Sequence, residues 1–147
     1  MLHTAYLSEK ISQKIEVNTA LAKAGAYYHK IGILEGDNTT ENTLKVGRDN
    51  KFPKPLLKLL EEYGDGKSTQ ISKEAAVVQL SETVVTYISD AFLKDKNAVL
   101  DYEKIIDDII LKKMDSRDWN KCVLTMGELC KIREGLAEVK LYYDFLR

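Results

Sequence analysis

Apolar residues recur along the chain at helical spacing, and no stretch alternates apolar and polar residues as a half-buried strand does. The clearest run follows Ser72, whose hydroxyl can cap the start of a helix. Beyond it, apolar residues fall at successive fourth positions, which places them on one helix face. We predict a long helix whose stripe lies in the core. The stripe consists of Ala76, Leu80, Val84, Ile88 and Phe92.

Capping residues, prolines and glycines divide the rest of the chain into shorter helical segments. This pattern of helix boundaries predicts an all-α fold, with one compact domain of six or seven helices spanning residues 1–147. The first segment carries Leu2, Leu7, Ile11 and Ile15. The expected later starts are Asn18, Thr39 or Thr40, Pro53, Ser72, Asp101 and a capping box from Thr125 to Glu128, and the expected ends include Lys30, Gly47 and Gly64.

Composition narrows the classes of function. The 147 residues, 44% of them hydrophobic, suffice for a single core. The net charge of -1, from 22 basic and 23 acidic residues, gives no reason to expect a nucleic-acid or membrane-surface partner. Cys122 and Cys130 are spaced poorly for a disulfide framework or zinc site, so we interpret them as reduced thiols on the edge of a helix.

The apolar runs are too short for a membrane span or a secretory signal, which predicts a cytoplasmic protein without a membrane segment. Residues 64–70 look like a phosphate loop but lack the spacing of a P-loop, so we interpret them as a connector. Glu82 interrupts the apolar stripe of the long helix, and a buried acid needs a partner. It is therefore a candidate site residue.

The stretch AGAYYHKIGIL, residues 24–34, resembles the sequence AGAYYHDIGKL of the HD-domain metal-dependent phosphohydrolases. Lys30 stands in place of the family's acid, and Ile33 in place of its lysine. Residues 118–136 resemble one branch of this family, the membrane-anchored phosphodiesterases that cleave cyclic di-AMP. The resemblance implies the family's helical fold.

Two further segments carry the resemblance. Residues 51–66 are similar to a family helix that ends in His-His-Gly, but here Glu62, Tyr63 and Gly64 form the ending. Residues 71–84, ISKEAAVVQLSETV, resemble SKEAAILMLADSV, which supplies the family's last metal-binding aspartate. Glu82 aligns with that aspartate. The stretch between His29 and Pro53 is shorter than in the family and contains no histidine.

The resemblance implies two-metal phosphoester hydrolysis, which requires several imidazole and carboxylate ligands. Only His3 and His29 match the family's histidines, and Lys30 adds a positive charge. Two like unit charges ~4 Å apart repel by about 4 kcal/mol at an effective dielectric constant of ~20, and a divalent ion roughly doubles this energy. We therefore expect no dinuclear metal centre and no cofactor.

The same charge argument predicts that Lys30 pairs with Glu82 in the former metal pocket, an arrangement that Glu62 can join. Glu62 and Tyr63 are also interpreted as the surface end of a helix. The candidate vestigial pocket therefore comprises His3, His29, Lys30, Glu62 and Glu82.

Three functions stay open. The leading hypothesis is a non-enzymatic module that binds a nucleotide or cyclic dinucleotide through Lys30, Lys67 and Lys73, or that contacts a protein partner. The rival is an active metal-dependent phosphohydrolase or phosphodiesterase, with manganese or iron held by His3, His29 and Glu82. In the third interpretation the resemblance reports ancestry only, and side chains fill the pocket.

Overall fold

The structure, a computed structural model, describes residues 2–64 and 70–147. Within these ranges it contains eight α-helices and two 3₁₀ helices, and it has no strand longer than an isolated bridge. The all-α prediction is confirmed, with one helix more than the largest number expected. The elements are α1 (Leu2–Lys14), α2 (Thr19–Tyr28), η1 (Ile31–Glu35), α3 (Thr40–Asp49), α4 (Lys54–Gly64), α5 (Lys73–Lys94), α6 (Tyr102–Asp115), η2 (Asp118–Lys121), α7 (Met126–Glu138) and α8 (Lys140–Asp144).

The helices begin at the capping residues that the sequence indicates. The side chain of Asn18 accepts a hydrogen bond from a backbone N–H in the first turn of α2, and Ser72 does the same for α5. Thr39, not Thr40, caps α3, and Asp101 caps α6. The capping box of α7 is complete, with reciprocal bonds between Thr125 and Glu128. Each cap satisfies a donor that the helix itself leaves unpaired.

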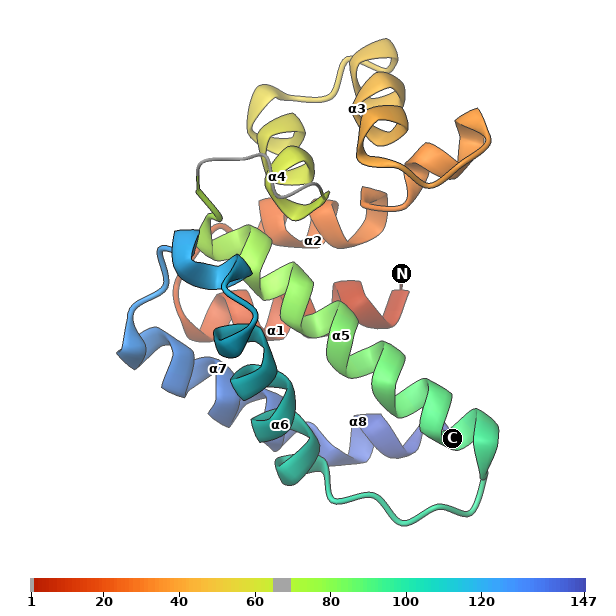
Figure 1. The fold of residues 1–147 in the computed structure, drawn as a ribbon, viewed down its shortest axis with the longest axis vertical. Helices are drawn as coiled ribbons and strands as arrows, with labels where there is room; N and C mark the ends of the chain where they lie inside the picture. The colour runs from red at the N-terminus through yellow and green to blue at the C-terminus, as the bar shows by residue number, and fades with distance from the viewer. Residues whose placement is uncertain (1, 65–69) are drawn as a thin grey trace.

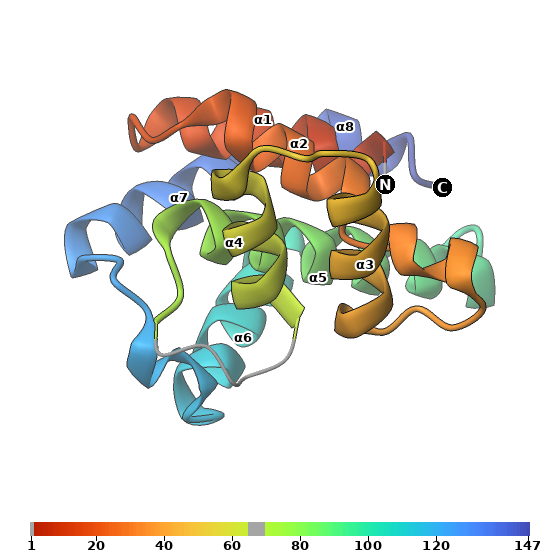
Figure 2. The ribbon, with the colours of Figure 1, turned by 90° about the horizontal axis from the view of Figure 1, so that it is seen from above.

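Helix α5 occupies the centre of the molecule. It packs against α1 and α2 on one side, against α6 on another and against α4 near its start, while α3 packs on α4 and η1 (Figures 1 and 2). The predicted stripe on α5 is buried, because these helices cover it from different directions. Because the stripe faces the core, it determines which face of α5 lies near the polar side chains of the site.

The C-terminal part departs from the expectation of one last helix. Helix α7 ends at Glu138, and α8 follows after Val139. The hydroxyl of Tyr143 donates a hydrogen bond to the Leu136 carbonyl, 2.7 Å away, and its ring is fully buried. Burial of this aromatic ring turns the chain back onto the core, a tertiary effect that helical spacing does not reveal.

The interpretation of Cys122 as a residue on a helix edge is wrong. Cys122 follows η2 and forms a single parallel bridge with Ile71, because the backbone N–H of Ile71 and that of Val123 bond across the two segments. Both cysteines of the chain are free thiols. In the ranges that the structure describes, no helix is long and apolar enough to cross a membrane.

The close contact of η1 with α3 allows a test of the packing next to the site. A Cβ atom at Gly32 would lie 2.8 Å from the Thr39 carbonyl oxygen and 2.8 Å from the Thr43 backbone nitrogen. Backbone atoms of a helix start cannot rotate away, so we expect Gly32→Ala to lower the free energy of unfolding by about 1–3 kcal/mol. Chemical denaturation measures this change.

Gly127→Ala is the matched control, because the nearest atom to its added Cβ is 3.9 Å away. This variant should unfold at the same denaturant concentration as the wild type or slightly above it, since alanine favours helix. Equal stability of the two variants would contradict the packing described for η1.

Candidate functional site

The carboxylate of Glu82, on α5, is the centre of a small polar cluster. Its Oε1 atom lies 2.9 Å from the ammonium of Lys30, and its Oε2 atom lies 3.2 Å from Nε2 of His29. The hydroxyl of Thr4, on α1, donates a hydrogen bond of 3.0 Å to Oε2. The predicted ion pair between Lys30 and Glu82 is therefore confirmed, and three helices meet at one carboxylate.

The end of α2 positions the two basic side chains. His29 caps this helix, and its Nδ1 lies 2.8 Å from the Ala26 carbonyl oxygen. A carbonyl only accepts, so Nδ1 carries a proton and Nε2 is the nitrogen that faces Glu82. Nε2 attracts the carboxylate only when it also carries a proton, so this contact is an ion pair in the imidazolium form of His29. Lys30 follows directly and reaches the other carboxylate oxygen.

These contacts determine the ionisation of the acid. The interactions with His29, and then with Lys30 and Thr4, hold the pKa of Glu82 well below its usual range, although partial burial opposes this shift. Burial and the charge of Glu82 together raise the pKa of the neighbouring Tyr63 hydroxyl. At neutral pH the site therefore contains a carboxylate, an ammonium and a protonated phenol.

A cavity of about 140 Å³ opens beside this cluster. The ring of Tyr63 lies 4.8 Å from that of His29 and forms part of its wall. Hydroxyl and amide groups with one ammonium can hold a polar or anionic group. The other lining residues are Lys30, Asn38, Thr39, Thr40, Thr43, Leu60 and Gly64.

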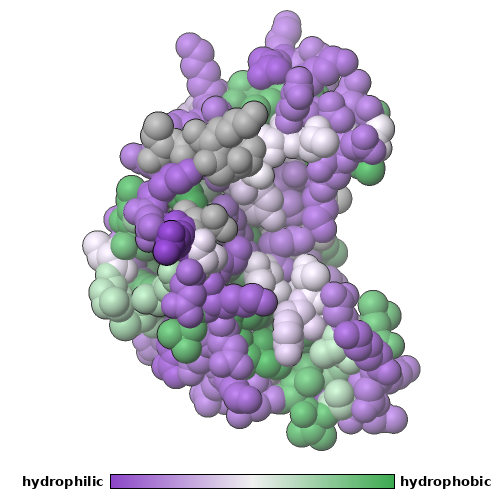
Figure 3. Space-filling view, viewed as in Figure 1, coloured by the Kyte–Doolittle hydropathy of each residue, from purple (hydrophilic) through white to green (hydrophobic). Residues whose placement is uncertain are grey.

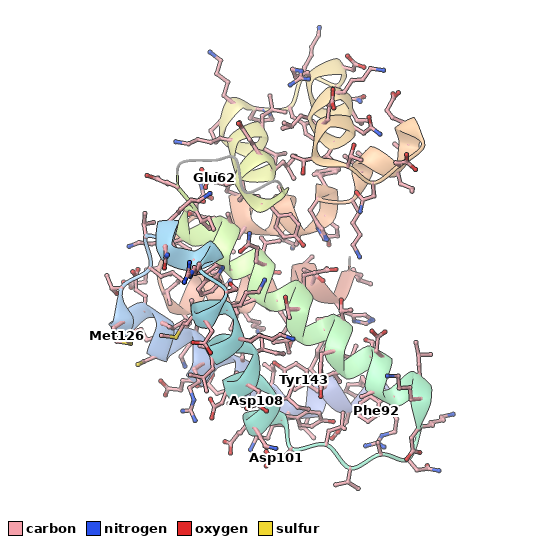
Figure 4. The ribbon with its side chains drawn as sticks, viewed as in Figure 1. Glu62, Phe92, Asp101, Asp108, Met126 and Tyr143 are labelled. Carbon is pink, nitrogen blue, oxygen red and sulfur yellow. The ribbon has the colours of Figure 1, made fainter. Side chains whose placement is uncertain are left out.

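The interpretation of Glu62 and Tyr63 as the surface end of a helix is wrong. Glu62 is 4% exposed, and its carboxylate accepts a 2.6 Å hydrogen bond from the backbone N–H of Ser72. Figure 4 labels Glu62 near the start of α5. The carboxylate thus fastens α4 to the first turn of α5 and does not join the pair of Lys30 and Glu82.

His3 also lies apart from the cluster. Its side chain is exposed, and Nδ1 contacts the Tyr142 hydroxyl on α8. Thr4, one residue later, faces Glu82 instead. Successive residues on a helix point about 100° apart, so the direction of one side chain excludes the other from the same site.

Of the two other lysines proposed for ligand binding, the structure describes only Lys73, which lies away from Lys30. Lys73 forms an ion pair with Glu128, 2.8 Å away on α7. It precedes Glu82 by nine residues on the same helix, about 14 Å along the axis at the usual helical rise. Lys67 lies outside the described residues.

The donors present do not fit the two divalent metal ions that the resemblance implies. Within residues 2–64 and 70–147, no three His, Cys, Asp or Glu side chains are grouped to hold a metal ion, so His3, His29 and Glu82 are not assembled as a ligand set. The Lys30 ammonium already contacts the Glu82 carboxylate. A cation would have to displace another cation to reach it.

Glu82→Gln tests the electrostatic role of the carboxylate. Hydrogen bonds to charged groups contribute about 1.5–3 kcal/mol each, so we expect this variant to lose about 1–3 kcal/mol of unfolding free energy at pH 7. Because the pKa of Glu82 is depressed in the folded state, its contribution is fully present above the ordinary pKa of a glutamate, 4.5, and is lost as the pH falls below that value. The stability difference between wild type and variant should therefore shrink in acid.

Urea unfolding between pH 7 and pH 3 measures this difference. Glu61→Gln is the control, because Glu61 is exposed on α4. A constant difference between wild type and Glu82→Gln across this pH range would contradict the assignment.

Comparison with known proteins supports the fold. No family model matches the chain. The cyclic-di-AMP phosphodiesterase PgpH of Bacillus subtilis (strain 168) is 23% identical to this chain over 90% of it, and the match spans only 26% of PgpH.

Two solved structures of the L. monocytogenes PgpH HD domain match this fold, and one of them is in complex with cyclic-di-AMP. Their TM-scores are 0.77 and 0.75 at 19% and 20% identity, and each match covers 96% of this chain and 88% or 90% of the other. The chain is therefore similar in sequence to a part of PgpH and has the fold of the PgpH HD domain.

Proposed function

We propose that this HD-like domain binds a phosphate-bearing nucleotide without a dinuclear metal centre, and that it serves as a regulatory or binding module instead of a hydrolase. The contact of 2.9 Å between Lys30 and Glu82 is the observation that carries this proposal. A cytoplasmic location, which the two free cysteines favour, belongs to the same proposal.

The first argument concerns charge. Two divalent ions need several negative or neutral donors, and the cluster offers one carboxylate, one imidazole and an ammonium. Lys30 is about half exposed, so its charge is partly screened, but it contacts the carboxylate directly. Because Lys30 already neutralises part of the negative charge of Glu82, the carboxylate would attract a metal ion less strongly. The ammonium would also repel the metal ion.

The second argument concerns the cavity. Lys30 lines it together with the hydroxyls of Thr39 and Thr40 and with Tyr63. An ammonium and several hydroxyl groups supply the hydrogen bonds that a phosphate oxygen accepts. A PgpH HD domain of the same fold has been solved in complex with cyclic-di-AMP, which makes this dinucleotide the first ligand to test.

Metal analysis tests the loss of the metal centre. Wild-type protein should contain no stoichiometric manganese or iron by elemental analysis, and Mn²⁺ should not raise its melting temperature. Lys30→Asp should gain a Mn²⁺-dependent rise in melting temperature, because it places a second carboxylate beside His29 and Glu82. Lys30→Gln is the control, since it removes the positive charge without adding a ligand.

Stoichiometric manganese or iron in the wild type, lost on His29→Ala, would instead favour the metal-dependent hydrolase and contradict the proposal. An increase in Mn²⁺ affinity in Lys30→Gln equal to that in Lys30→Asp would show that removal of the positive charge is sufficient for Mn²⁺ binding without the added carboxylate.

Calorimetry with cyclic di-AMP tests the ligand. We expect binding to the wild type, at least tenfold weaker binding to Lys30→Ala, and unchanged binding to Lys58→Ala, an exposed lysine on the far part of α4. Chromatography of the mixture should recover the dinucleotide intact. Hydrolysis in the presence of Mn²⁺ would refute the binding-module proposal, and no binding at millimolar concentration would favour common ancestry alone.

A further inference from the structure

Sulfur-containing side chains gather in a groove between α6 and α7, on a different part of the molecule from Glu82. A cavity of about 300 Å³ there is lined by Met114, Met126 and Cys130. These are three of the five sulfur-containing residues of the chain. Met114 and Met126 are 45% and 68% exposed, so they do not serve as core-filling side chains.

Two helices contribute these side chains to one cavity. Met126 and Cys130 are four residues apart on α7, and this spacing places them on one face with Cβ atoms about 5–6 Å apart. Met114 comes from the facing helix α6 and lines the same cavity. Met126 is labelled in Figure 4 at this edge of the molecule, where Figure 3 also shows hydrophobic surface.

The remaining lining offers no free oxygen or nitrogen ligand. Ile110, Leu111 and Leu129 are apolar. Asp107 and Arg133 close one end of the cavity and bind each other through both carboxylate oxygens, with Nη2 of Arg133 3.0 Å from Oδ2 of Asp107 and a second bond from Nε to Oδ1. A hard cation such as Mg²⁺ or Mn²⁺ would have to displace Arg133 from the Asp107 carboxylate to bind here.

We propose that this groove is a site for a soft monovalent metal ion, Cu⁺, bound by the Cys130 thiolate and the thioethers of Met114 and Met126. Thiolate and thioether ligands select Cu⁺ over oxygen-preferring metals. Binding releases the thiol proton of Cys130, and the copper remains in the +1 state.

Cys122 belongs to a neighbouring cavity of about 240 Å³, which Met114 and Met126 also line. Burial raises the pKa of its thiol, so Cys122 is a poorer source of thiolate. Cys122→Ser is therefore the control for Cys130→Ser. It distinguishes binding at a defined site from binding by any thiol of the protein.

Competition with a colorimetric Cu⁺ chelator, under anaerobic conditions and with reduced protein, tests the site. We expect one Cu⁺ per chain, at least tenfold weaker binding in Cys130→Ser and in Met126→Leu, and wild-type binding in Cys122→Ser. Leucine conserves the volume of methionine, so Met126→Leu removes the sulfur with little effect on packing. X-ray absorption of the loaded protein should show sulfur ligands only.

Circular dichroism of each variant establishes that the helical fold is retained. Failure of the wild type to compete with the chelator would overturn the proposal and leave the groove as a surface for an apolar partner. Equal loss in Cys122→Ser and Cys130→Ser would also overturn it, as would unchanged affinity in Met126→Leu.

Discussion

One carboxylate, that of Glu82, organises the polar part of this helical fold. It sits in a helix whose apolar stripe is buried, and groups from α1 and from the end of α2 contact its oxygens. An unpaired acid in this position would be costly, so the contacts with Lys30, His29 and Thr4 are conditions for packing α5 in this register. The neighbouring cavity is polar as well, because Lys30 both contacts the carboxylate and lines the cavity.

The helical framework is predictable from the sequence because its signals are local. A cap such as Ser72 and a stripe such as that on α5 depend on residues within one or two turns. Features that depend on distant contacts are not predictable in this way. Glu62 was expected at the surface, yet its acceptor role becomes visible only when α4 and α5 meet, and α8 separates from α7 because Tyr143 finds a buried position.

The charged part of the site is predictable from the sequence. An ammonium beside a histidine and an acid within an apolar stripe together predicted the pair of Lys30 and Glu82. The role of Thr4 was missed, because a threonine gives no chemical signal and His3 beside it gave a stronger one. Alignment to a resembling family fixes a position only to the nearest residue, whereas one residue turns a helical side chain toward a different neighbour. Lys73 shows a similar limit: it lies on the same helix as Glu82, but nine residues away along the helix axis.

The pairing of Lys30 with Glu82 also constrains how this protein can change. An acid at position 30 with no metal present would set two carboxylates against each other, and loss of Glu82 would leave two basic groups without their counter-charge. Each single step away from the present arrangement lowers stability, and only a combined change restores balance. Positions 30 and 82 are therefore coupled: a change of charge at one of them is tolerated only together with a compensating change at the other.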